Sequence, residues 1–170
     1  GGNIGLASKY FDLNIDNKKI ICIEPEKNNL ELSKKNNNSD IDFLNCAVGS
    51  QNTSGNIIDP GLGNFAYRIT EKSNESGQSV EIVTINRLIS KYTDNNTLPF
   101  LIKIDIEGFE KNLFQENLEW IEKFPVIIIE IHDWMMPKQN ISSNFLKAIS
   151  KHERDFIFIG ENIYSISNKI

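Results

Sequence analysis

Short apolar runs alternate with longer amphipathic segments along most of this 170-residue chain. The runs KIICI (19–23), FLIKI (100–104) and VIIIEI (126–131) have the length and the branched side chains of strands that are buried on both faces. The segments between them carry apolar residues at helical spacing. Parallel strands need long crossover connections, so this alternation indicates βαβ units. We therefore predict an α/β fold with a doubly wound, mostly parallel sheet.

The same patterns place the individual elements. We expect helices over Leu6–Leu13, Glu26–Lys35, a short helix capped by Asn86 and ending at Tyr92, Phe109–Phe124 and Ser143–Lys151. We expect strands over Lys19–Ile23, Ile41–Val48, Ser79–Ile85, Phe100–Ile106 and Val126–Ile131, followed by an antiparallel hairpin of Phe156–Ile159 and Ile163–Ile166. All belong to a single domain, 1–170, in which residues 50–78 form a loop or hairpin insertion.

Composition excludes several classes of function. The net charge of −5 and the isoelectric point near 5.1 argue against a general nucleic-acid or anionic-membrane binder, which needs a basic surplus. The strongly apolar run that starts at Val126 meets Glu130 at once, so we expect no membrane span. Two cysteines, Cys22 and Cys46, cannot make a disulfide framework, and we expect both in the core of a cytoplasmic protein.

Polar residues or glycines follow nearly every apolar run, where an open parallel sheet binds its ligands. These strand-end groups are Gly1-Gly2-Asn3-Ile4-Gly5, Glu24-Pro25, Asn45-Cys46-Ala47, Asp105 with Glu107-Gly108, and Glu130 with His132-Asp133. Their recurrence at successive strand ends indicates a binding crevice more strongly than any one of them.

The first two groups fit a nucleoside-bearing cofactor. The turn GGNIG opens a helix, so its backbone N–H groups can face a polar ligand, although such a turn can also be only a turn. Glu24 ends the next strand, where a carboxylate can accept hydrogen bonds from both ribose hydroxyls; the alternative is an acidic helix N-cap. The dinucleotide pattern G-x-G-x-x-G is absent, which favours S-adenosylmethionine (SAM) over NAD.

The segments GGNIGL, IEPEKNNLELSKKN, FLNCAVGS, LIKIDIEGFEKNLF and VIIIEIH, in this order, resemble the FkbM-type family of SAM-dependent methyltransferases. The resemblance runs from Gly1 to about Asp133, and KIDIEGFE is its most specific element. It implies the seven-stranded methyltransferase fold and O-methylation of a hydroxyl on a sugar, a glycan or a secondary metabolite. In the family a strand ending in Asp precedes the Gly turn, so we expect that this strand is cut here and that the native chain is longer.

The resemblance also implies roles for individual residues. It maps the cofactor turn onto Gly1, Gly2, Asn3 and Gly5, the ribose contact onto Glu24 with Pro25, and the adenine border onto Cys46 and Ala47. Asp105 would lie where the methionine end of the cofactor meets the acceptor, as a catalytic or acceptor-orienting group with Glu107 behind it. His132 could be the general base, because an imidazole titrates near neutral pH.

Other readings of these residues stay open. Asp105 and Glu107 could cap the helix that starts near Gly108, and His132 could be structural. Asp105, Glu107, Glu130 and His132 could also assemble a metal site, but no ligand spacing demands one, and we assign no metal from the sequence.

Acceptor recognition points to two further places. The insertion, with Phe65, Tyr67 and Arg68, is the best candidate for an acceptor-binding region or lid, and Trp134 could border the acceptor or anchor a loop. The competing functions are a non-catalytic or degenerate SAM-binding domain and, less favoured, an NAD-dependent oxidoreductase.

Overall fold

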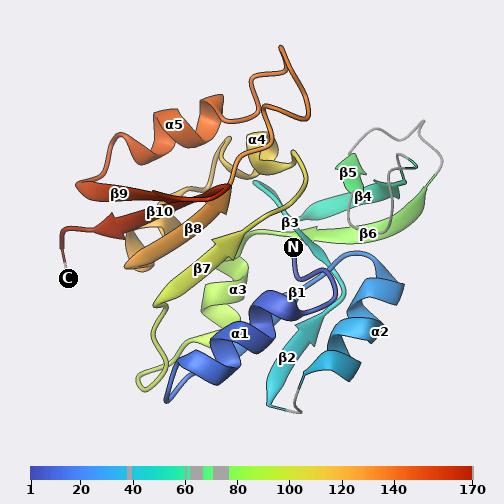
Figure 1. Cartoon of the computed structure of the whole chain (residues 1–170), viewed down its shortest axis with the longest axis horizontal. Helices are drawn as coiled ribbons and strands as arrows, with labels where there is room; N and C mark the ends of the chain where they lie inside the picture. Colours follow the sequence, from blue (N-terminus) through green and yellow to red (C-terminus); the bar gives the residue numbers. More distant parts are fainter. Residues whose placement is uncertain (38–39, 60, 62–66, 71–76, 170) are drawn as a thin grey trace. The chain divides into compact units, whose positions relative to one another are not determined.

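The computed structural model describes residues 1–37, 40–59, 61, 67–70 and 77–169 (Figure 1). The backbone groups into two compact units. The N-terminal unit comprises Gly1–Val48 and Thr53–Ile82, and the C-terminal unit comprises Gly49–Asn52 and Val83–Ile170.

The N-terminal unit begins with a βαβ arrangement. Its elements are α1 (Leu6–Asn14), β1 (Ile20–Ile23), α2 (Lys27–Asn36) and β2 (Ile41–Leu44). Strands β1 and β2 pair in parallel, with Ile20 opposite Ile41 and Ile23 opposite Leu44. α1 packs on β1 and α2, and α2 packs on β2. The carboxyl ends of β1 and β2 therefore lie side by side, as the sequence predicts.

The rest of this unit is a small sheet built largely from the insertion. Its strands are β3 (Ala47–Val48), β4 (Thr53–Ile58), β5 (Arg68–Thr70) and β6 (Gln78–Val83), in the order β3-β6-β4-β5. β4 pairs antiparallel with both β5 and β6. In their described part, residues 50–78 contain β4, β5 and the first residue of β6. Phe65, proposed for acceptor recognition, lies outside the described residues, whereas Tyr67 directly precedes β5 and Arg68 opens it.

The C-terminal unit is built on a mixed sheet in the order β7-β8-β10-β9. Its elements are α3 (Ile85–Tyr92), β7 (Leu101–Ile104), α4 (Glu110–Leu113), the 3₁₀ helix η1 (Glu119–Lys123), β8 (Val126–Glu130), α5 (Ser143–Ile149), β9 (Arg154–Ile159) and β10 (Asn162–Ser167). β7 and β8 are parallel, and β10 is antiparallel to both β8 and β9. The predicted terminal hairpin is confirmed.

The expected strand Ile41–Val48 is divided into β2 and β3, which belong to different sheets. Two predictions about helices are also wrong. The expected helix Phe109–Phe124 is interrupted between Leu113, where α4 ends, and Glu119, where η1 begins. In this interval Asn117 takes a left-handed conformation (φ 57°), and its side-chain amide donates to Ser50 O at 2.7 Å. The helix ending at Tyr92 is capped by Thr84, whose hydroxyl accepts from Arg87 N–H at 3.2 Å, rather than by Asn86. The spacing of apolar residues does not specify where a helix is interrupted or which residue caps it. In these two places a contact with a distant or a neighbouring residue accompanies the outcome.

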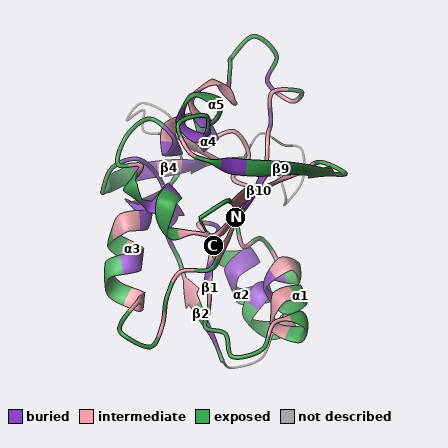
Figure 2. Cartoon of the chain, turned by 90° about the vertical axis from the view of Figure 1, so that its left-hand side faces the viewer, coloured by how far each residue is buried: buried purple, intermediate pink, exposed green. Residues whose placement is uncertain are grey.

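Burial follows the apolar strands of the C-terminal unit. Ile127 and Ile129 of β8 are fully buried, and Trp120 packs against Phe114 with ring centroids 5.4 Å apart, as expected for a packing residue. The edge strand β9 is exposed after its first residue (Figure 2). In the N-terminal unit, Leu6, Tyr10 and Leu13 of α1 are also largely exposed although they share a face.

The fold class is confirmed as mixed α/β. Within the described residues the strands divide into a parallel pair, a mixed sheet and a largely antiparallel sheet. The single doubly wound, mostly parallel sheet therefore stays a prediction. Among the helices of the described part of the chain, none combines the length and apolar character that crossing a membrane requires.

Candidate functional site

The N-terminal glycine turn lies against the end of β1. Gly2 N–H donates to Ile23 O at 2.7 Å, and Gly5 N–H donates to Gly2 O at 2.9 Å. A Cβ built on Gly2 would lie 2.5 Å from Cys22 Sγ, so packing against the strand requires glycine at this position. Asn3 takes a left-handed conformation (φ 44°), which turns its N–H toward the strand end.

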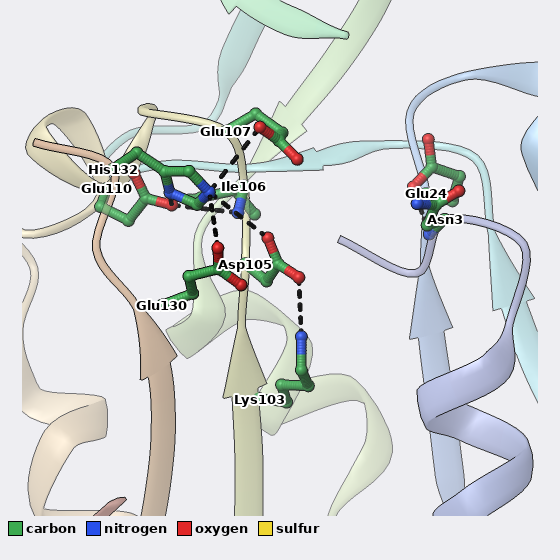
Figure 3. A network of polar contacts seen from close by, with 9 residues as sticks. All are labelled: Asn3, Glu24, Lys103, Asp105, Ile106, Glu107, Glu110, Glu130 and His132. Carbon is green, nitrogen blue, oxygen red and sulfur yellow. Dashed lines mark hydrogen bonds and ion pairs between the residues drawn. The ribbon is translucent and has the colours of Figure 1, made fainter. Parts of the chain in front are cut away.

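The Glu24 carboxylate joins this turn to the start of α2. Its Oε2 accepts from Asn3 N–H at 2.7 Å, and its Oε1 accepts from Glu26 N–H at 3.0 Å (Figure 3). The residue is only 5 % exposed. Each carboxylate oxygen carries two lone pairs, so both can still accept a further hydrogen bond. The carboxylate is held in one orientation and keeps acceptor capacity for a ligand.

The alternative role of Glu24 as the helix N-cap is not what the structure has. The N-cap of α2 is Glu26, whose Oε2 accepts from Asn29 N–H at 2.7 Å. Glu24 instead accepts a hydrogen bond from the backbone N–H of Glu26, the N-cap residue itself. Its burial is therefore not explained by capping.

The end of β2 adds a third segment to this edge. Glu24 N–H donates to Leu44 O at 3.0 Å, which holds the ends of β1 and β2 together. The side-chain amide of Asn45 donates to Glu24 O at 3.0 Å and to Pro25 O at 2.8 Å. Cys46 and Ala47 follow directly and are both buried. Asn45 is a positioning residue to which the sequence analysis gave no role, although an Asn at a strand end was a signal for one.

The second set of predicted residues meets at the carboxyl ends of β7 and β8 in the C-terminal unit. Ile104 of β7 pairs with Ile129 of β8, so the residues that follow these two positions lie at one edge of the sheet. Asp105 follows β7, Glu130 ends β8, and His132 lies two residues beyond it. Figure 3 shows these side chains converging with those of Glu107 and Glu110; we call this set the carboxylate–histidine cluster.

His132 is held at the centre of the cluster by Glu110. The imidazole is 1 % exposed, and its Nδ1 lies 3.0 Å from Glu110 Oε1. The same oxygen accepts from Ile106 N–H at 3.0 Å, and Glu110 is fully buried. A carboxylate only accepts hydrogen bonds, so Nδ1 is the donor toward Glu110, and Nε2 is the ring nitrogen that faces the rest of the cluster.

His132 Nε2 faces three carboxylate oxygens. It lies 3.6 Å from Glu130 Oε1, 3.7 Å from Asp105 Oδ1 and 3.7 Å from Glu107 Oε2. These separations exceed hydrogen-bond length. The atoms offered by Asp105, Glu107 and His132 all lie within 4.8 Å of one another, so these residues could also hold a metal ion.

Burial and charge shift the pKa values in this cluster. Burial and the neighbouring carboxylates raise the pKa of Glu107 and of Glu130. Burial acts in the same direction on Asp105, but its 2.8 Å ion pair with Lys103 outweighs it and holds that pKa below its ordinary value. Burial lowers the pKa of His132, but the hydrogen bond at Nδ1 and the surrounding carboxylates outweigh it and raise that pKa.

The capping role open to Asp105 and Glu107 is not observed. Phe109 is the N-cap of α4 and has no side-chain cap bond. Glu107 (φ 53°) and Gly108 (φ 96°) are both left-handed, and a Cβ on Gly108 would collide with Met136 Cε. This sharp turn returns the chain so that Glu110, and not Asp105 or Glu107, bonds the backbone of Ile106.

Sequence reasoning missed Glu110, a member of the cluster, and Lys103, the ion-pair partner of Asp105. Glu110 stands three residues after Glu107 in KIDIEGFE, and Lys103 interrupts an apolar strand. A charged residue inside a buried strand and an acidic residue beside a glycine turn were the available signals. Trp134, proposed to border the acceptor or to anchor a loop, is 68 % exposed.

The predicted cofactor residues Gly1, Gly2, Asn3, Gly5, Glu24, Pro25, Cys46 and Ala47 thus lie in the N-terminal unit, whereas Asp105, Glu107 and His132 lie in the C-terminal unit. Within each unit the predicted residues gather at one sheet edge. The single crevice that would contain both groups stays a prediction.

Comparison with known protein families finds one match. The model of the methyltransferase FkbM domain matches residues 1–158, which include both groups of site residues. No curated protein and no solved structure matches the chain.

Proposed function

Because this chain belongs to the FkbM methyltransferase family, we propose that it transfers a methyl group from SAM to a hydroxyl of a sugar, a glycan or a secondary metabolite. The main support for SAM as the methyl donor is the environment of the Glu24 carboxylate. It is buried at a strand end, bonded to the Asn3 N–H of the glycine turn, and not used as a helix cap. A ribose offers two hydroxyl donors that suit its remaining lone pairs.

The cofactor end of the proposed site is the edge formed by β1 and β2. Glu24 and Pro25 would contact the ribose, the turn from Gly1 to Gly5 would face the methionine part, and Cys46 and Ala47 would border the adenine. The hydrogen bonds that join Glu24, Asn3 and Asn45 support this assignment, because they hold the three segments together before a ligand arrives.

The acceptor end of the proposed site is the carboxylate–histidine cluster at the carboxyl ends of β7 and β8. When bound, SAM would supply the methyl group: a C–O bond to the acceptor hydroxyl would form as the S–C bond breaks, and the electron pair of that bond would stay on the sulfur of the neutral thioether product. The cluster would accept the hydroxyl proton. Asp105, Glu107 and His132 are the catalytic or acceptor-orienting residues of this proposal, since enzymes of this kind work mainly by alignment and proton removal.

A cytoplasmic location belongs to the same proposal. Cys22 and Cys46 are both buried thiols, which fits a reducing compartment. The acidic balance of the chain, with a net charge of −5, fits a small-molecule or glycan acceptor better than a nucleic acid.

Titration calorimetry with SAM and with NADH tests the proposal, and Glu24→Gln is the decisive variant. The substitution keeps the shape of the side chain but removes its charge and half of its acceptor capacity. Hydrogen bonds to charged groups contribute about 1.5–3 kcal/mol, so we expect SAM to bind Glu24→Gln about 10–100-fold more weakly. Glu31→Gln is the matched control, because Glu31 lies exposed on α2 in an ion pair with Lys34 and should leave SAM binding unchanged. Binding of NADH in place of SAM, or equal SAM affinity in Glu24→Gln and wild type, would contradict the proposal.

A further inference from the structure

We propose that Asp105, Glu107 and His132 bind a divalent cation of the Mn²⁺ type at the carboxyl ends of β7 and β8. The inference deepens the proposed function and rests on it for the role of the cation in catalysis. Binding of the cation itself is a property of the C-terminal unit, so it can be measured without SAM or an acceptor.

The first argument is the orientation of the imidazole. His132 Nδ1–H donates to Glu110 Oε1 at 3.0 Å. Nε2 then faces a group of carboxylate oxygens 3.6–3.7 Å away. These negatively charged oxygens repel one another, and a cation placed between them and Nε2 would attract each of these atoms.

The second argument is an unsatisfied oxygen. Within the described residues Glu107 Oε2 is buried and has no hydrogen-bond partner, although it lies 3.7 Å from His132 Nε2. Buried polar atoms without a partner are rare and costly, and each calls for an explanation such as an ion. A metal ligand bond would satisfy this oxygen.

The spacing of the atoms suits a metal ion. Two ligands of one cation lie at most two bond lengths apart, which is about 4.2 Å for bonds of about 2.1 Å. The separations of 3.7 Å from Nε2 to Asp105 Oδ1 and to Glu107 Oε2 fall below that limit. They are also longer than hydrogen bonds.

The charge around the site is strongly negative. Four carboxylates, those of Asp105, Glu107, Glu110 and Glu130, lie around His132. Lys103 is paired with Asp105 Oδ2 at 2.8 Å and leaves Asp105 Oδ1 directed at the imidazole. One ammonium group therefore does not balance the cluster, and a divalent cation would reduce the mutual repulsion of its carboxylates.

The surroundings of His132 match those of a metal-ligating histidine. Such histidines commonly donate their second ring N–H to a carboxylate, which fixes the tautomer and raises the basicity of the ligand. Here Glu110 is the carboxylate that bonds Nδ1 of His132, and Ile106 N–H donates to the same oxygen of Glu110 and holds it in position. We assign Glu110 as a positioning residue that acts through His132.

The ligand set also suggests the class of metal and its use. Carboxylates favour Mg²⁺, Ca²⁺ and Mn²⁺, whereas imidazole favours transition metals, and Mn²⁺ accepts both kinds of ligand. When bound, such a cation would hold the hydroxyl oxygen of the acceptor and stabilise its deprotonated form.

Mn²⁺ alone is the probe for the test, added to the full chain without SAM and followed by calorimetry and electron paramagnetic resonance. We expect one Mn²⁺ per chain and a ¹⁴N modulation in the pulsed spectrum, which reports an imidazole on the metal. The Mn²⁺ affinity should fall about 10–100-fold in Glu110→Gln, and His132→Gln should also lose the ¹⁴N modulation. The matched control is His152→Gln, because His152 contacts only Glu122 among described charged groups, at 3.4 Å, and should leave both signals unchanged.

Absence of Mn²⁺ binding at millimolar concentrations, or bound Mn²⁺ without ¹⁴N modulation in wild type, would overturn the inference. Neither result depends on whether a variant folds. A parallel titration with SAM separates the two proposals. Methyl transfer that persists unchanged after chelation would overturn the inference and leave the proposed function standing. Mn²⁺ binding at His132 in a protein that does not bind SAM would support the cation site and reject the proposed function.

Discussion

Arg154 is the buried charged residue on which the C-terminal unit should depend most. It opens β9, is only 8 % exposed, and its guanidinium donates to five oxygens. Nε donates to Ser165 Oγ at 2.7 Å, and the Nη atoms donate to the carbonyls of Ile121, Phe124, Pro125 and Ser165 at 2.9–3.3 Å. This side chain therefore ties the segment before β8 to the terminal hairpin.

We predict that Arg154→Met destabilises the protein by about 3–5 kcal/mol. Methionine fills similar space but donates no hydrogen bond, so buried carbonyl oxygens lose their donor at a cost of about 1–3 kcal/mol each. Local relaxation and water entry recover part of the sum, and breaking a buried charged network typically costs about 3–5 kcal/mol. The partners are mainly backbone carbonyls, which cannot be exchanged for apolar groups, so apolar replacement should not restore stability.

Urea unfolding followed by circular dichroism measures this change. With a slope of about 2 kcal/mol per molar urea, the midpoint should fall by about 1.5–2.5 M. Lys151→Met is the control, because Lys151 is exposed in the same unit and should change stability by less than about 0.5 kcal/mol. A midpoint for Arg154→Met within about 0.3 M of wild type, at unchanged slope, would refute this account of the network.

Two further predictions concern the motif KIDIEGFE. Asp105→Asn keeps the shape of the side chain that faces His132 but removes its charge, so methyl transfer from labelled SAM to a hydroxyl acceptor should slow by about 100-fold or more; unchanged turnover would remove Asp105 from the mechanism. Gly108→Ala should lower the free energy of unfolding by about 2–4 kcal/mol, because alanine is strained at φ 96° and its Cβ would collide with Met136. Urea unfolding measures that loss, and a stability equal to wild type would show that the turn relaxes without cost.

The order and type of most elements follow from local sequence. Strands β1, β7 and β8 are runs of branched apolar residues, which pack well on both faces of a sheet whatever lies beside them. The terminal hairpin follows from two such runs around Gly160, whose φ of 58° suits a tight turn. These features depend on neighbours in the chain, so a pass along the sequence finds them.

Predictions from local sequence patterns were wrong where the backbone conformation depends on a contact with a residue far away in the sequence. Apolar spacing from Phe109 to Phe124 is compatible with one helix, but α4 ends at Leu113, and the bond from Asn117 to Ser50 O accompanies a left-handed residue before η1 begins. The spacing carries no information about a carbonyl 67 residues away in the chain. Capping by Thr84 instead of Asn86 is a smaller error of the same origin, because element ends depend on small differences between competing hydrogen bonds.

By itself, the sequence determined the family, the strand ends that carry chemistry, and the residues Glu24, Asp105, Glu107 and His132 as candidates, because parallel strands bring their carboxyl ends to one edge. Only the tertiary structure decided what surrounds them. In the folded chain α2 is capped by Glu26 and not by Glu24, and Glu110 bonds His132 Nδ1. Three carboxylate oxygens lie 3.6–3.7 Å from His132 Nε2. Periodicity specifies the face on which a side chain lies, but the distance between two side chains depends on the turns and packing that only the folded chain fixes.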